Sequence, residues 1–140
     1  METCNLVFVY GTLMSGYGNN RLLRNHEATF VGEDKTEDVF VLGDVGFPYA
    51  VTKEGLEASG YTFNEDLLKP VIGEVWEIPN DDCLSSLDRL EGVPHHYQRN
   101  LTSMQSGKTV WMYQQEDPSV LFHCSKCHEE EGAWKWLHTY

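Results

Sequence analysis

The sequence Asn-Leu-Val-Phe-Val-Tyr-Gly-Thr-Leu occupies residues 5–13 and decides how the fold begins. Its β-branched and aromatic residues are apolar on both faces and stop at Gly11, which predicts a buried strand over residues 5–10. The loop that follows, residues 11–20, contains three glycines. Because glycine permits torsions and close approaches that other residues forbid, this loop can turn backbone N–H groups toward a ligand carboxylate. Taken alone, the string is equally typical of a strand that enters an ordinary turn.

Size and charge restrict the class of protein. The chain has 140 residues, of which 41% are hydrophobic and 23% charged, a composition typical of a folded globular protein. A chain of this length buries about two thirds of its unfolded surface, so a single domain over residues 1–140 is expected. The net charge is −12 and no segment gathers enough Lys and Arg to neutralise a run of phosphates, so neither nucleic acid nor membrane is an expected partner. Residues 1–10 have neither the basic start nor the apolar length of a signal or membrane segment, and a cytoplasmic location is therefore expected.

Alternating and β-branched segments predict further strands at residues 29–31, 39–42, 50–52, 61–63 and 71–78, and a hairpin formed by residues 97–104 and 109–114. Within the strand over 71–78, Gly73 indicates the close approach of another backbone. Residues 21–24 predict a short helical turn. Residues 129–137 predict a final amphipathic helix with Ala133, Trp134 and Leu137 facing inward.

The clearest helix is predicted between Asn80, a suitable N-cap, and Gly92, a suitable C-terminal stop. Its apolar stripe is expected to consist of Cys83, Leu84, Leu87 and Leu90. Glu91 follows in the last turn, where its carboxylate could face the edge of a cavity. Burial and the negative end of the helix dipole would both raise its pKa, which suits a group that accepts and returns a proton near neutral pH. A solvated glutamate at a helix end is the alternative.

Two other groups of side chains could carry chemistry. Tyr97 and Arg99 flank Gln98 on the same strand face, and Arg99 could either clamp a ligand carboxylate or pair with a surface acid. The tail from about residue 118 contains a Cys-x-x-Cys segment, which is half of a structural zinc site, or a polar loop with reduced thiols. Its candidate ligands are His123, Cys124, Cys127 and His128, with His95 and His96 as conceivable additions.

Four motifs, in order, resemble the gamma-glutamylcyclotransferase superfamily, which is also called AIG2-like. Phe8-Val9-Tyr10-Gly11-Thr12-Leu13, followed by Asn20, Leu22 and Leu23, resembles the opening strand and the Tyr-Gly-Ser/Thr-Leu loop of that family. Gly73-Glu74-Val75-Trp76 is similar to its Gly-x-Val/Leu-Tyr/Trp strand. Leu87-Asp88-Arg89-Leu90-Glu91-Gly92 and Tyr97-Gln98-Arg99 resemble its Leu-Asp-x-x-Glu and Tyr-x-Arg elements. The resemblance covers residues 7 to about 113. The chain length and Phe47-Pro48-Tyr49 are most similar to the small gamma-glutamylamine cyclotransferase branch.

The resemblance implies an α+β fold, a compact mixed β-barrel with flanking helices, and a cavity between the Tyr10 loop and the helix that ends at Glu91. The implied substrate is a small gamma-glutamyl compound, which is converted into 5-oxoproline and a free amine without a cofactor. Glu91 would be the catalytic acid/base. The residues implied in substrate binding are Tyr10, Gly11, Thr12, Leu13, Tyr97 and Arg99, with the backbone of Gly11, Thr12 and Leu13 on the alpha-carboxylate.

Two other function classes stay open at this point. The same cavity could belong to a non-catalytic module that binds a small acidic ligand or a protein such as a toxin or defence factor. A zinc-dependent enzyme or module could instead be built on the tail. The sequence does not reveal which amine leaves: gamma-glutamyl-epsilon-lysine, a gamma-glutamyl polyamine and a gamma-glutamyl dipeptide all fit. The oligomeric state is equally open.

Overall fold

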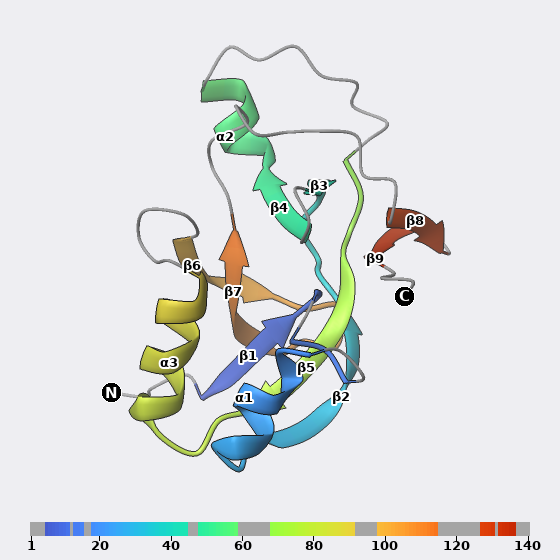
Figure 1. The fold of residues 1–140 in the computed structure, drawn as a ribbon. Helices are drawn as coiled ribbons and strands as arrows, with labels where there is room; N and C mark the ends of the chain where they lie inside the picture. Colours follow the sequence, from blue (N-terminus) through green and yellow to red (C-terminus); the bar gives the residue numbers. More distant parts are fainter. Residues whose placement is uncertain are drawn as a thin grey trace.

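The computed structural model describes residues 5–11, 13–15, 18–44, 48–58, 68–91, 98–114, 127–130 and 132–136. Its elements, shown in Figure 1, are β1 (Leu6–Val9), α1 (Asn20–Asn25), β2 (Thr29–Lys35), β3 (Phe40–Asp44), β4 (Pro48–Thr52), α2 (Lys53–Ala58), β5 (Ile72–Glu77), α3 (Asp81–Glu91), β6 (Gln98–Ser103), β7 (Thr109–Gln114), β8 (Cys127–Glu130) and β9 (Ala133–Trp136). The predicted strand over 61–63 lies outside the described residues.

The largest layer is a five-stranded mixed sheet in the order β2-β5-β1-β7-β6. The central strand β1 is antiparallel to β5 and parallel to β7, while β3 with β4 and β8 with β9 form separate pairs. The two edge strands meet at one end, where the Glu37 N–H donates to Ser103 O (3.0 Å) and the Gln105 N–H donates to Lys35 O (2.8 Å). The sheet is therefore strongly curved. The α+β class is confirmed, but no closed barrel is found among the described strands, and the barrel stays a prediction.

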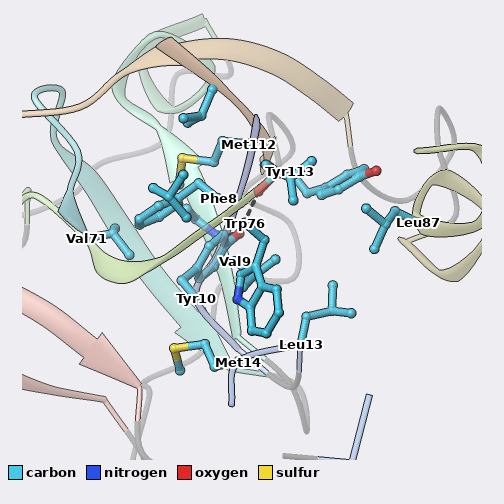
Figure 2. Packing of buried hydrophobic residues seen from close by; sticks show 14 of the residues in the cluster. Phe8, Val9, Tyr10, Leu13, Met14, Val71, Trp76, Leu87, Met112 and Tyr113 are labelled. Carbon is cyan, nitrogen blue, oxygen red and sulfur yellow. Dashed lines mark hydrogen bonds between the residues drawn. The ribbon is translucent and has the colours of Figure 1, made fainter. Parts of the chain in front are cut away.

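The core lies around β1, as Figure 2 shows. Val7, Phe8 and Val9 are almost completely buried, which agrees with a strand whose two faces are both apolar. The close approach predicted at Gly73 is confirmed, because a Cβ atom there would lie 2.4 Å from the Val9 carbonyl oxygen and 2.7 Å from the Phe8 ring. Only glycine fits between these strands at that register.

Helix α3 begins as predicted, with the Cys83 N–H donating to the Asn80 side-chain oxygen at 3.0 Å. Cys83 and Leu87 are fully buried, but the expected burial of Leu90 is wrong, because its side chain is 43% exposed. The reason is helical geometry. Positions four and eight after Cys83 are Leu87 and Glu91, so the buried stripe continues through Glu91, and Leu90 falls beside it. Glu91 therefore continues the buried stripe at the position predicted for Leu90.

The predicted hairpin of residues 97–104 and 109–114 is confirmed as β6 and β7. The final helix over 129–137 is wrong. Strands β8 and β9 form a hairpin there, with Gly132 at φ 80°, a conformation that interrupts a helix and that glycine adopts without strain. Ala133 is buried, as predicted, and Trp134 packs partly against the core, but they do so from a strand. Helix α2 was not predicted, although the Thr52 hydroxyl accepts a hydrogen bond from the Gly55 N–H at 3.0 Å and so caps it.

Helix α1 follows the loop after β1, to which its Asn20 side chain is hydrogen-bonded, whereas α2 extends beyond β4 and lies away from α1 and α3 (Figure 1). None of the described helices has the length and apolar composition that crossing a bilayer requires.

Candidate active site

Tyr10 directly follows the central strand β1 and is buried, with 6% of the residue exposed. Its hydroxyl donates to the Tyr113 carbonyl oxygen (2.7 Å) and accepts from the Ala50 N–H (3.0 Å), so it joins β1 to β7 and to β4. Figure 2 shows Tyr10 and Tyr113 within the same packed cluster. Burial raises the pKa of Tyr10 far above its usual value, and the negative charge of Glu91 adds to that effect. The phenol therefore stays protonated and acts as a structural tie between strands.

We expect Tyr10→Phe to lower the free energy of unfolding by about 1–3 kcal/mol, because it removes both buried hydrogen bonds of the hydroxyl and leaves the Ala50 N–H without this acceptor. Urea denaturation followed by circular dichroism measures the change. An unchanged denaturation midpoint would contradict the role of the hydroxyl as a tie.

Glu91 is the last residue of α3 and is half-buried. Burial raises its pKa to about 7. The negative charge of Glu91 contributes to the raised pKa of both Tyr10 and Tyr113. Desolvation alone accounts for the direction of the shift in Glu91. A carboxyl group with this pKa is divided between its two protonation states near neutral pH, as a proton shuttle requires.

The loop after β1 is held at several points. The Met14 N–H donates to the Gly11 carbonyl oxygen at 3.0 Å and closes a turn. The side-chain amide of Asn20 donates to the carbonyl oxygen of the buried Leu13 at 2.8 Å. Gly11 is half-buried at the start of this turn. Thr12, predicted to bind substrate with its backbone, lies outside the described residues.

A polar cluster lies between α3 and the strands β6 and β7. The Tyr113 hydroxyl donates to one Asp88 carboxylate oxygen at 2.7 Å, and Arg99 Nη1 lies 3.5 Å from the other. The Arg99 guanidinium also lies over the Trp111 ring, 4.4 Å from its centroid. Burial, followed by the hydrogen bond with Asp88, raises the pKa of Tyr113. Of the two alternatives for Arg99, the structure shows a pairing with an acid of the same chain.

These contacts connect most of the described candidates. Tyr10 contacts Tyr113, Tyr113 contacts Asp88, and Asp88 lies one helical turn before Glu91. Tyr113 and Asp88 were not predicted as candidate site residues. Asp88 was quoted within the Leu-Asp-x-x-Glu motif, but nothing local in the sequence indicates that it meets a tyrosine 25 positions later.

The remaining candidates cannot be placed in the site. Tyr97, His95, His96, His123 and Cys124 lie outside the described residues. Cys127 and His128 belong to β8, where the structure describes the backbone. Within the described part of the chain, no cluster of three His, Cys, Asp or Glu side chains could hold a metal ion. Zinc binding by the tail stays a prediction, which elemental analysis of the purified protein would test.

Comparison with known proteins identifies the family. The model of the family described as gamma-glutamyl cyclotransferase, AIG2-like, matches residues 7–136. A protein of Methanocaldococcus jannaschii, named provisionally as a gamma-glutamylcyclotransferase, is 32% identical over 76% of this chain and 81% of its own length. A protein of Vibrio cholerae with the same provisional name is 33% identical over 78% of this chain and 80% of its own length.

The fold is also similar to a solved structure. The crystal structure of an AIG2-like protein from Mus musculus superposes with a TM-score of 0.66 over 87% of both chains, at 24% sequence identity. Because the family model spans nearly the whole described core, from the first strand to β9, the match includes both the Tyr10 loop and the helix that ends at Glu91. The chain belongs to the AIG2-like gamma-glutamyl cyclotransferase family.

Proposed function

We propose that this protein is a cyclotransferase that converts a gamma-glutamyl amine or amide into 5-oxoproline and a free amine, with Glu91 as the general acid/base. The observation that carries the proposal is the position of Glu91: it ends α3 on the stripe of Cys83 and Leu87, where burial raises its pKa to about 7, and its charge contributes to the raised pKa of Tyr10. A desolvated carboxylate destabilises the fold, so its presence favours a role in proton transfer over a passive binding cavity.

The reaction needs little from the protein because the substrate carries its own nucleophile. The Glu91 carboxylate takes a proton from the alpha-ammonium group, and the freed amine nitrogen attacks the gamma-carbonyl carbon. The bond between that carbon and the departing nitrogen then breaks, and Glu91 delivers its proton to this nitrogen. The second proton lost by the original ammonium passes through solvent to the released amine. The products are the lactam and an ammonium ion, so atoms and charges balance.

Positioning supplies the rest of the rate. Holding the substrate folded brings the amine against its own carbonyl, and a well-oriented intramolecular reaction gains several kcal/mol in this way. In this proposal the backbone N–H groups of Gly11, Thr12 and Leu13 bind the alpha-carboxylate, and donors near the loop steady the developing oxyanion. Tyr10 and Tyr97 line the pocket, and Arg99 belongs to the substrate-binding set. The proposed reaction needs no metal or other cofactor.

The proposed substrate class is that of the small gamma-glutamylamine cyclotransferase branch. It rests on the short chain and on Phe47-Pro48-Tyr49. A small molecule is the proposed partner, and a cytoplasmic location stays a prediction. The departing amine is left open among lysine side chains, polyamines and amino acids.

The test is an assay of 5-oxoproline release from a panel: gamma-glutamyl-epsilon-lysine, a gamma-glutamyl polyamine and a gamma-glutamyl dipeptide. We expect release from at least one of them, undiminished by a chelator. The N-acetylated form of the active compound is the matched control, because acetylation removes the nucleophilic amine and should abolish release. Binding of a panel member without any release would contradict the enzyme and support the non-catalytic binding module.

A further inference from the structure

Glu74 lies on β5 beside Gly73 and collects three hydrogen bonds on a single carboxylate oxygen. This oxygen, Oε1, accepts from the Ser15 backbone N–H at 2.8 Å, from the Ser15 hydroxyl at 3.2 Å and from the Trp76 indole N–H at 3.1 Å. Hydrogen bonds to an ionised acceptor are shorter and stronger than those between neutral groups. Glu74 therefore connects the loop after β1 to the central sheet across 59 positions of the sequence.

On the strand side, the donor ring of Trp76 is packed. Trp76 is 6% exposed, and the Phe30 ring packs against it with 5.4 Å between the ring centroids. This packing orients the indole N–H, which donates a hydrogen bond to the Glu74 carboxylate independently of the loop. The half-buried Glu74 side chain then presents the same oxygen to Ser15. A packed aromatic ring positions the acid, and the acid positions the loop.

Ser15 follows the turn directly. That turn is closed by the bond from the Met14 N–H to Gly11 O, and its Leu13 carbonyl is held by the buried Asn20. Asn20 and Glu74 therefore hold the segment from two different elements, α1 and β5. Without the Glu74 carboxylate, Ser15 would lose two hydrogen bonds to the sheet. The Glu74 carboxylate would repel a substrate carboxylate bound at the loop. The three donors to Glu74 Oε1 partly offset its negative charge.

We infer that Glu74 is a positioning residue for the loop after β1, to which Gly11 and Leu13 belong. It fixes this loop in the conformation that binds the substrate carboxylate. This inference rests on the proposed function for its effect on the substrate, but its effect on the loop does not. Glu74 acts through Ser15 and does not itself take part in proton transfer. Its removal should consequently weaken substrate binding far more than it slows the chemical step.

The experiment compares Glu74→Ala, Glu74→Gln and Glu77→Ala. Glu77 is an exposed acid on the same strand, so its substitution removes the same charge without touching the loop. We expect Glu74→Ala to raise KM about tenfold while kcat changes less than about threefold, which is the signature of lost binding. Glu74→Gln keeps an acceptor oxygen and should restore most of the affinity. Amide hydrogen exchange at Ser15 should be faster in Glu74→Ala than in Glu77→Ala.

The two readouts separate the inference from the proposed function. If the wild-type protein releases no 5-oxoproline from any gamma-glutamyl compound, the proposed function fails, and exchange at Ser15 alone decides whether Glu74 holds the loop. If the wild type is active, an unchanged KM in Glu74→Ala overturns the inference. Equal exchange rates at Ser15 in Glu74→Ala and Glu77→Ala overturn it in either case. A decrease in kcat equal to the rise in KM, unrelieved in Glu74→Gln, would indicate general structural damage and overturn it as well.

Discussion

Glu91→Gln is expected to lower kcat by about 100- to 10,000-fold, the usual contribution of a general acid/base, while the affinity for substrate changes little. The amide has nearly the shape of the carboxyl group, so the pocket is preserved, but it cannot accept the proton of the ammonium group. Steady-state kinetics gives kcat, and calorimetric titration of the inactive variant gives the dissociation constant. Equal turnover in the two proteins would show that another group moves the proton.

The same variant should reveal what the buried carboxylate costs the fold. The pKa of Glu91 in the folded protein is about 7, above the value of about 4.3 for an unfolded glutamate, so the folded state binds the proton more tightly. The contribution of Glu91 to the stability of the wild type therefore declines as the pH rises from about 4.3 to about 7. Glutamine does not titrate, so the advantage of Glu91→Gln over the wild type should grow between pH 5 and pH 8. Asp82→Asn, which also removes one carboxylate from the same helix, is the matched control for the loss of a charge at an exposed position.

Gly73→Ala should be strongly destabilising. The added Cβ would lie 2.4 Å from the Val9 carbonyl oxygen, a backbone atom of the central strand that cannot move without disturbing its pairing with β5 and β7. We expect a loss of about 3 kcal/mol or more in the free energy of unfolding, at the upper end for overpacking of a core. The urea midpoint of the purified variant measures this loss.

Gly18→Ala is the matched control, because no atom lies within 4 Å of a Cβ built at that position. Its midpoint should stay close to that of the wild type. Should Gly73→Ala prove as stable as Gly18→Ala, the close packing of β5 on β1 would be wrong. The activity of Gly73→Ala should also be lower than that of the wild type, because displacement of Val9 would shift Tyr10, the next residue, at the proposed site.

Local signals explain what the sequence could predict about the fold. The buried strand β1 is visible as an uninterrupted apolar run, α3 through its Asn80 cap, and the β6–β7 hairpin through alternation around a short turn. The last described segments, residues 127–130 and 132–136, were harder to predict. Glu129 and Glu130 suit a helix by composition, but Gly132 at positive φ and the pairing of β8 with β9 favour strands. Tertiary pairing overrides a weak local preference of this kind.

The site shows the same division between local and distant contacts. Glu91 was recognisable because its place at the helix end follows from nearby residues. The face of α3 that is buried was not predicted correctly. Leu90 was expected on the buried stripe, but the stripe passes through Glu91. The partners of Glu74 and Tyr113 are 59 and 25 positions away. Pairing over such distances depends on how the sheet curves, which no single segment encodes.

The most direct test of the account is the ionisation of Glu91 itself. A carbon-13 NMR titration of the labelled side-chain carboxyl, assigned by its loss in Glu91→Gln, should give a pKa of about 7. The acid limb of the kcat/KM profile should report the same value, because the carboxylate is the form that accepts the proton. A titration near the ordinary glutamate value of about 4.3 would contradict the claim that Glu91 is the proton shuttle. A kcat/KM profile whose acid limb does not fall at the measured pKa would contradict it as well.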